Sequence, residues 1–249
     1  MPFKQLNTIY IGYDPKEDAY VKVLEKSIRD NTKQTFNIVP IVQHSLRKIG
    51  MYWRSHEINQ DGVNVDCFDK KPFSTEFSFT RFLCPFLNQR RGYALFLDAD
   101  MYLRSDISEI FDRYASSYTA LSVVKHDYQP TDTLKMDGQV QTNYSKKNWS
   151  SLMLWNCEHP AHDRLTVADV NTKPGSWLHQ FDWLESDEIS GIHPEWNWLD
   201  GHSPDTLNAK LVHFTTGGPL FPNWKPKRDI DNEYATDWKH LYSNYLKEQ

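Results

Sequence analysis

The order of apolar and polar positions along the chain predicts strands and helices in alternation. Residues 6–11 form a short apolar run rich in β-branched and aromatic side chains, and the Gly, Asp and Pro of "GYDPKED" end it. From Asp18 to Asn31 the apolar residues recur at helical spacing, which predicts an amphipathic helix that covers a sheet. These apolar residues are Ala19, Tyr20, Val23, Leu24 and Ile28. The segment "FNIVPIV", residues 36–42, predicts a second strand.

Residues 44–72 are less regular, and the alternation resumes after them. A helix is predicted over 78–88, with a kink or an early end at Pro85, because proline cannot donate the backbone hydrogen bond of a helix interior. The segment "GYALFLDAD", residues 92–100, is the clearest strand in the chain.

A capped helix and a further strand follow. The segment "DISEIFDRY" predicts a helix with Asp106 as its N-cap and Glu109 three residues later. Residues 118–124, "YTALSVV", predict a strand. Alternation of this kind through residue 124 is typical of an α/β fold, in which ligands bind beyond the carboxyl ends of the strands. We therefore expect a mostly parallel sheet flanked by helices.

The second half of the chain contains one long polar stretch and then further elements. Residues 126–148 are polar and weakly periodic, which predicts a long functional loop. The predicted elements after it are a strand in "WSSLMLWN" (149–156), helices at 165–171 and 176–185, a strand in "AKLVHF" (209–214) and a last helix at 233–246.

Composition limits the classes of protein. The 249 residues, 39% hydrophobic and 24% charged, are typical of a globular protein, and we expect one domain over 1–249. A net charge of -5 argues against a general nucleic-acid binder, although it leaves a local basic cleft open. The start of the chain lacks the pattern of a signal peptide and no apolar run is long enough to span a bilayer, so we expect a cytoplasmic protein.

Cysteine and aromatic content say less about function. The three cysteines are far apart and in no paired spacing, so they predict buried thiols and neither a disulfide framework nor a zinc site. Nine tryptophans are unusual, and their faces either stack on sugars or fill a core, of which composition favours the core.

The pair Asp98 and Asp100 follows the clearest strand. In an extended chain, residues two apart point the same way, so both carboxylates can face one site while Ala99 faces the other side. Two carboxylates this close repel each other unless a cation or hydrogen-bond donors offset their charge. Oxygen ligands of this kind suit Mg²⁺ or Mn²⁺, whereas the competing interpretation is a capped turn.

A second cluster lies in "KLVHFTTGGPLFPNW". The strand delivers His213 as a third metal ligand, and the turn of Thr216, Gly217 and Gly218 allows backbone amides to approach a phosphate. A buried core histidine followed by a plain glycine turn is the alternative. The acidic pair elsewhere in the chain favours the metal-site interpretation.

These segments occur in an order that resembles a known group of enzymes. "GYD" after the first strand, "SFTRFLCPFL", "LFLDAD", "NWSSLMLWN" and "VHFTTGGP" are arranged as in glycosyltransferases of the GT-A fold, and the sequence looks most like family 8 and its bacterial relatives. The resemblance covers most of the chain. It implies a metal-dependent transferase that uses a nucleotide-diphosphate sugar. It also implies that the single domain has a nucleotide-sugar-binding half (1–124) and an acceptor-side half (125–249).

The resemblance also assigns donor-side roles residue by residue. Ile11, Gly12, Tyr13 and Asp14 match the loop that holds the nucleotide, and Arg81 matches an arginine that reaches the sugar and diphosphate, although a surface arginine is the alternative. Asp98, Ala99 and Asp100 match the D-x-D motif that binds Mn²⁺ with the donor, and His213 matches the metal-binding histidine. Ser150 and Ser151 match a strand beside the donor sugar.

One part of the family pattern is missing. Thr216 and Pro219 stand where the family signature after His213 has glycine and a phosphate-binding lysine. Lys225 or Lys227 are candidates to replace that lysine, and the amides of the Thr-Gly-Gly turn are the other candidate.

Catalytic candidates come from two further segments. "WLHQFDWL" falls where the family presents Asp and Gln to the sugar, so Gln180 and Asp182 are candidates, ahead of His179. "HPEWNWLDG" offers Glu195 beside two tryptophans, which form either an acceptor platform or part of the core.

The sequence therefore predicts a transferase that moves a hexose from a UDP-sugar to a glycan or other hydroxyl acceptor, with retention of configuration. Two alternatives are open: an inverting enzyme in which Asp182 or Glu195 is the base, and a metal-dependent binding module without turnover. A phosphohydrolase is disfavoured because Tyr102 stands two residues after the second Asp, where such enzymes usually have Thr or Val. The absence of a Walker A lysine loop argues against a nucleotide kinase.

Overall fold

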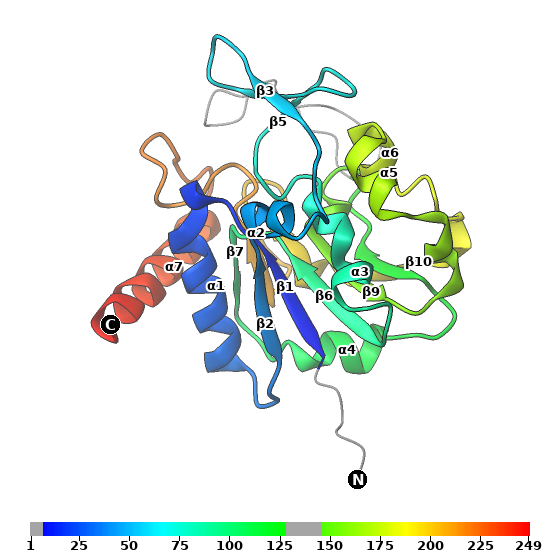
Figure 1. Ribbon diagram of the computed structural model, residues 1–249. Coiled ribbons are helices and arrows are strands. Elements are labelled where there is room, and N and C mark those ends of the chain that lie inside the picture. Colours follow the sequence, from blue (N-terminus) through cyan, green and yellow to red (C-terminus); the bar gives the residue numbers. More distant parts are fainter. Residues whose placement is uncertain (1–6, 128–145) are drawn as a thin grey trace.

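A six-stranded sheet forms the centre of the computed structural model, which describes residues 7–127 and 146–249 (Figure 1). The strands lie in the order β10-β8-β9-β6-β1-β2. Their bounds are Thr8–Gly12 (β1), Asn37–Ile41 (β2), Tyr93–Leu97 (β6), Leu121–Val124 (β8), Leu152–Asn156 (β9) and Ile189–Ile192 (β10). Only β9 runs antiparallel to its neighbours β6 and β8, and the other pairs in this sheet are parallel. The predicted α/β fold with a mostly parallel sheet is confirmed.

Helices flank this sheet. The two long ones, α1 (Asp18–Asn31) and α7 (Asp229–Lys247), lie side by side at one end of it (Figure 1). Tyr20 of α1 packs against Trp238 of α7 with ring centroids 4.8 Å apart. The shorter helices are α2 (Gln43–Lys48), α3 (Cys84–Leu87), α4 (Ser108–Tyr114), α5 (Val167–Thr172) and α6 (Gly175–His179). The bounds of α1 are those that its hydrophobic periodicity predicts.

Two small sheets complete the fold. In one, β3 (His56–Ile58), β4 (Asn64–Asp66) and β5 (Pro72–Phe73) pair antiparallel, and they stand above the carboxyl end of β1 in Figure 1. Arg54 binds Asp66 with two contacts of 2.7 Å inside this segment, and both side chains are buried. This buried ion pair stabilises the segment 44–72, for which the irregular sequence predicted no regular structure.

The other small sheet carries part of the site. It contains β7 (Met101–Leu103), β11 (Trp198–Leu199) and β12 (Leu211–His213) in the order β11-β12-β7. The antiparallel register of β12 and β7 places His213 opposite Met101. A histidine from the end of the chain is thereby brought next to the residues that follow β6.

Local differences from the predicted helices have physical reasons. The helix expected over 78–88 is a 3₁₀ helix, Thr80–Leu83 (η2), followed by α3 with Pro85 in its first turn. The helix expected from Asp106 begins at Ser108: the Asp106 carboxylate accepts hydrogen bonds from the backbone N–H and the hydroxyl of Ser108, so it closes the preceding turn. Glu109 does not complete a capping box, because its carboxylate binds Lys210 at 2.8 Å.

The helix expected over 176–185 is short. It ends at His179, and Phe181 adopts a left-handed backbone conformation with φ of 55°. That turn directs Phe181 and Trp183 into a cluster with Phe82, in which all three rings are buried. Burial of these aromatic rings outweighs continued helix formation. The strand expected over 149–156 likewise begins only at Leu152, after a 3₁₀ turn at Trp149–Ser151 (η3).

Tryptophan and cysteine side chains mostly fill the core. Six of the nine tryptophans are buried, which confirms the core interpretation for most of them. All three thiols are free; Cys84 and Cys157 are buried and Cys67 is partly exposed. Burial raises the pKa of the Cys157 thiol to about 12, so this thiol is not reactive at neutral pH. No helix in the described part of the chain is long and apolar enough to cross a membrane.

Candidate functional site

A cavity of about 610 Å³ lies beyond the carboxyl ends of β1 and β6. Asp98 and Asp100, which follow β6, line it together with Arg81 from η2. His213 and the turn after β12 line it from the second half of the chain. The position agrees with the general rule that α/β sheets bind ligands at the carboxyl ends of their strands.

The acidic pair is held by backbone contacts with its neighbours. The N–H of Asp98 donates to the Ser151 carbonyl at 2.9 Å, and the Asp100 carbonyl accepts from Phe214 N–H at 2.9 Å. Ala99 is fully buried between the two, so the carboxylates face the cavity while the alanine faces the core. Both carboxylates face one site as the sequence predicts, but the backbone is not extended there: Ala99 and Asp100 lie in a turn between β6 and β7.

Asp98, Asp100 and His213 form a cluster that suits a divalent cation. One ligand atom from each residue lies within 4.8 Å of the others, and His213 Nε2 is 3.3 Å from Asp100 Oδ1. His213 is 3% exposed, whereas the two carboxylates are partly open to the cavity. Two carboxylate oxygens and one imidazole nitrogen are a donor set for Mn²⁺ or Mg²⁺ that leaves positions for further oxygens. The cluster joins residues from both halves of the chain.

Charge around His213 opposes the effect of its burial. Burial lowers the pKa of the imidazole. The Asp100 carboxylate raises it through its charge and a hydrogen bond, and the charges of Asp98 and Asp200 raise it further, so that the pKa is raised overall. The negative potential that favours a proton here also favours a metal cation. A cation would replace the proton on Nε2, because a metal ligand must be deprotonated at the bonding atom.

Arg81 is a buried residue of the cavity and not a surface arginine. Its Nη1 lies 2.7 Å from Asp98 Oδ1 and also donates to the Ser150 carbonyl at 3.0 Å. The guanidinium packs between the rings of Phe77 and Phe96, about 5 Å from each centroid. These four neighbours therefore hold one cationic group at the edge of the acidic cluster.

The first-strand loop contributes less than the sequence indicated. Ile11 is fully buried in the sheet, and the Tyr13 hydroxyl bonds to Asp18. Gly12 packs so closely that a Cβ there would lie 2.4 Å from the Phe77 ring, which lines the cavity. Asp14 lines the cavity, and its carboxylate accepts from the backbone N–H groups of Lys16 and Glu76, so it ties two loops at the rim.

The serines of η3 and the helix-end residues face the cavity. Ser150 and Ser151 are buried and line it, and the Ser150 hydroxyl is 2.9 Å from Nδ1 of His179. Burial, with the nearby charges of Arg81 and Lys147, moves the pKa of His179 well below its usual value, so this imidazole is neutral. Gln180 also lines the cavity, and its carbonyl accepts from the Lys146 ammonium.

Two of the catalytic candidates, Asp182 and Glu195, lie outside the described lining of the cavity. Asp182 follows the left-handed residue Phe181 and is exposed, outside the described lining of the cavity. Glu195 is held by Lys210, with Nζ to Oε1 at 3.2 Å, and it too is outside that lining. The acceptor platform is wrong, because Trp196 and Trp198 are fully buried. A base role for either carboxylate has no support in this geometry.

The turn after His213 is held by hydrogen bonds and close packing within the protein. Thr216 and Gly217 line the cavity, but Gly218 packs against Phe214 and Tyr20, and a Cβ there would lie 2.9 Å from each. The Gly217 N–H donates to the Phe214 carbonyl at 2.9 Å and the Thr216 N–H donates to Asp200 at 3.3 Å. Two of the amides expected to bind phosphate are therefore engaged within the protein.

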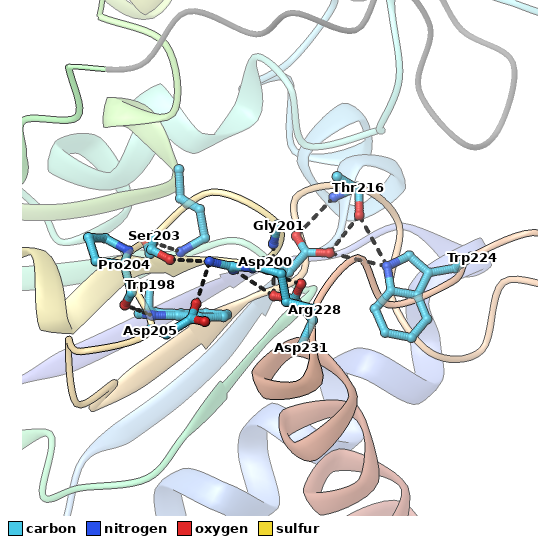
Figure 2. A network of polar contacts seen from close by, with 11 residues as sticks. Trp198, Asp200, Gly201, Ser203, Pro204, Asp205, Thr216, Trp224, Arg228 and Asp231 are labelled. Carbon is cyan, nitrogen blue, oxygen red and sulfur yellow. Dashed lines mark hydrogen bonds and ion pairs between the residues drawn. The ribbon is translucent and has the colours of Figure 1, made fainter.

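The Asp200 carboxylate holds this turn by hydrogen bonds, and no motif in the sequence indicated that role. Its carboxylate accepts from the Thr216 hydroxyl at 2.5 Å and from the Trp224 indole N–H at 3.1 Å, as Figure 2 shows. The network extends through the next residue: the Gly201 N–H donates to the Asp231 carboxylate at 2.8 Å, and Arg228 at the start of α7 donates to the same carboxylate at 2.7 Å. Burial, opposed by these hydrogen bonds, raises the pKa of Asp200 to about 6.

Lys147 is a second cavity residue that the sequence did not indicate. It is 8% exposed and lines the cavity, whereas Lys225 and Lys227, the two lysines considered for phosphate binding, are exposed and outside its described lining. The turn that presents it contains left-handed residues on both sides, Lys146 with φ of 63° and Asn148 with φ of 62°. Such backbone conformations carry strain in residues other than glycine, and they concentrate at functional sites.

Comparison with known proteins identifies the fold. No protein-family model matches the chain. Protein CDI of Arabidopsis thaliana is 42% identical over 245 residues, which cover 96% of this chain and 87% of that protein. Among solved structures, the galactosyltransferase LgtC in complex with donor and acceptor sugar analogues has a TM-score of 0.55 and 16% identity, with 95% of each chain covered.

Two other solved structures agree with that result. The bifunctional glycosyltransferase WbbM has a TM-score of 0.58 and 14% identity over all of this chain. The glycosyltransferase GlyE of Streptococcus pneumoniae TIGR4 has a TM-score of 0.56 and 14% identity over 98% of it. This chain spans about half of the WbbM chain (52%) and 64% of the GlyE chain. At these identities the likeness shows the fold, which is the GT-A fold of glycosyltransferases.

Proposed function

The chain belongs to the family of Protein CDI, and we propose that it is a metal-dependent glycosyltransferase that moves a hexose from a UDP-sugar to a hydroxyl acceptor, with retention of configuration. The observation that carries the proposal is the cluster of Asp98, Asp100 and His213, which lies in a cavity of about 610 Å³ in a GT-A fold. Fold alone would not support an activity, because one fold hosts many functions.

The donor site would combine a bound cation with fixed cationic side chains. A divalent cation held by Asp98, Asp100 and His213 would supply Lewis-acid stabilisation of the leaving diphosphate. Arg81 and Lys147 would bring fixed positive charge to the same phosphates, because both side chains are buried and line the cavity. Lys147 would thereby take the role of the phosphate-binding lysine that is missing at position 219.

The transfer would break the bond between the anomeric carbon and the β-phosphate oxygen, which leaves with the bonding electrons. The acceptor oxygen forms the new bond to that carbon, and its proton passes to the leaving phosphate. Gln180 is the residue for which the geometry supports a role beside the sugar, because it lines the cavity whereas Asp182 and Glu195 do not. Because Asp182 and Glu195 are not positioned as bases in this cavity, attack on the face of the leaving group is the outcome that we propose.

Ligand-dependent stability is the direct test. A ligand at about 100 times its dissociation constant raises the free energy of unfolding by about 2.7 kcal/mol. We expect UDP with Mn²⁺ to stabilise the protein clearly, and UDP without metal to have little effect. Asp98→Asn and Asp100→Asn should each abolish the metal-dependent part, while Asp112→Asn, at an exposed carboxylate on α4, serves as the matched control.

Turnover separates a transferase from a binding module. Release of UDP from a panel of UDP-sugars, with the product anomer identified by NMR, tests transfer and stereochemistry together. Retained configuration is expected. Protein that no nucleotide stabilises would refute the donor site, and metal-dependent UDP binding without release from any UDP-sugar would leave only a binding module. An inverted product would require a base other than Asp182 and Glu195, which lie outside the described lining of the cavity.

A further inference from the structure

We infer that Asn197 is the positioning residue of the metal site: it fixes the imidazole of His213 so that Nδ1 carries the proton and Nε2 is free to bind the cation. Asn197 ends the 3₁₀ helix Pro194–Asn197 (η6) and is fully buried. Its Oδ1 lies 2.9 Å from His213 Nδ1, on the opposite side of the ring from Asp100. The inference rests on the proposed metal-dependent function and deepens it.

The orientation of the Asn197 amide follows from its other contacts. The Ser151 hydroxyl donates to the Asn148 carbonyl at 2.7 Å, so its hydrogen is already used. Ser151 Oγ, 2.9 Å from Asn197, must therefore accept, and the group that faces it is the NH₂ of the amide. The same NH₂ reaches the Asn148 carbonyl at 3.5 Å. These contacts leave only the amide oxygen to face His213.

The amide oxygen then decides which imidazole nitrogen is protonated. An oxygen acceptor 2.9 Å from Nδ1 requires a hydrogen on Nδ1. In a neutral imidazole the other nitrogen, Nε2, then has a free lone pair, and it points toward Asp100 in the cluster. Partners of this kind orient metal-binding histidines and typically change metal affinity by 10–100-fold when they are removed.

The same side chain connects the metal site to the turn that carries Lys147. Asn148 follows Lys147 in the chain, and its carbonyl is the acceptor shared by Ser151 and Asn197. Removal of Asn197 would thus free both the histidine ring and the left-handed turn. A buried amide with every polar atom engaged is an arrangement in which loss of one partner is costly.

Metal affinity of matched variants is the experiment. Asn197→Leu has no acceptor for Nδ1, and we expect its Mn²⁺ dissociation constant, measured by calorimetry without nucleotide, to rise about 10–100-fold. Asn197→Asp keeps an oxygen at that position and should bind Mn²⁺ at least as well as the wild type. Asn171→Leu, at another fully buried asparagine that binds backbone groups of residues 51–54, controls for general damage to the fold.

Spectroscopy of the wild type tests the inference even if the leucine variant does not fold. In ¹⁵N-histidine-labelled protein loaded with Cd²⁺, a diamagnetic replacement for Mn²⁺, the proton of His213 should reside on Nδ1. A proton on Nε2 would overturn the inference, as would wild-type Mn²⁺ affinity in Asn197→Leu or a wild type that binds no Mn²⁺. Protein that binds Mn²⁺ with the expected variant pattern but releases no UDP would refute the transferase and leave the role of Asn197 intact.

Discussion

Asp200 makes a pH-dependent contribution to stability that can be calculated from its environment. The carboxyl group is 3% exposed, and its partners are the Thr216 hydroxyl and N–H and the Trp224 indole, with His213 and Asp231 nearby. Its pKa rises from 3.8 to about 6, because burial disfavours the charged form more than the hydrogen bonds favour it. Asp200→Asn removes this titration and keeps a side chain of almost the same shape.

The sign and size follow from linkage. The folded protein holds a proton on Asp200 that the unfolded chain has already released, so the contribution to stability is fully present below the unfolded pKa and is lost as pH rises to about 6. A shift of about two pKa units corresponds to roughly 3 kcal/mol, of which most is lost between about pH 4 and about pH 6. Above that range the contribution is constant.

Urea unfolding of metal-free protein at a series of pH values measures the effect. The free energy of unfolding of Asp200→Asn minus that of the wild type should increase by about 2–3 kcal/mol from about pH 4 to about pH 7. Taking the difference cancels the titration of all other groups, and Asp112→Asn controls for the loss of an acidic group at an exposed site. A difference that does not change with pH would show that Asp200 titrates normally and that the burial argument is wrong.

Three further substitutions test other parts of the site. Gly12→Ala places a Cβ 2.4 Å from the Phe77 ring and should destabilise the protein by about 1–3 kcal/mol, measured as a lower Tm; an unchanged Tm would mean that the ring moves freely. Lys147→Met should weaken UDP binding in the presence of Mn²⁺ at least about tenfold by calorimetry, since hydrogen bonds to charged groups contribute roughly 1.5–3 kcal/mol, and equal affinity would exclude this lysine from the phosphate site. Glu195→Gln should leave UDP release from UDP-sugars unchanged, because Glu195 pairs with Lys210 outside the cavity; loss of turnover would restore it as a base.

The sequence predicted the elements whose pattern is local. Helix α1 has the predicted bounds because its apolar residues repeat with the period of a helix and charged residues occupy the other face. The strand before Asp98 was equally predictable from its run of apolar residues. Asp98 and Asp100 line the cavity as expected, but Ala99 and Asp100 lie in a turn and not in the extended chain that the sequence argument assumed. His213 could be linked to that pair only through a resemblance, since 113 positions (213 minus 100) separate it from Asp100.

The parts that sequence could not give depend on tertiary contacts. Asp182 was expected to point from a helix at the sugar, but burial of Phe181 and Trp183 ends that helix at His179. Nothing local distinguishes Asn197 from any other asparagine in a loop, and its role depends on a histidine 16 residues later. A buried amide is recognisable only when all its hydrogen-bond partners are known.

The contacts of Asp200 with the turn after His213 explain in physical terms why this turn presents no lysine to the cavity. The turn that would present it is bound inward, because Thr216 and the Trp224 indole both donate to the Asp200 carboxylate. Pro219 lacks a backbone N–H, so it offers no donor to a phosphate in that turn. A segment held in this way stabilises the wall of the cavity but brings no cation to it. Under the proposed function, the positive charge must then come from other lining residues, among which Arg81 and Lys147 are buried cations.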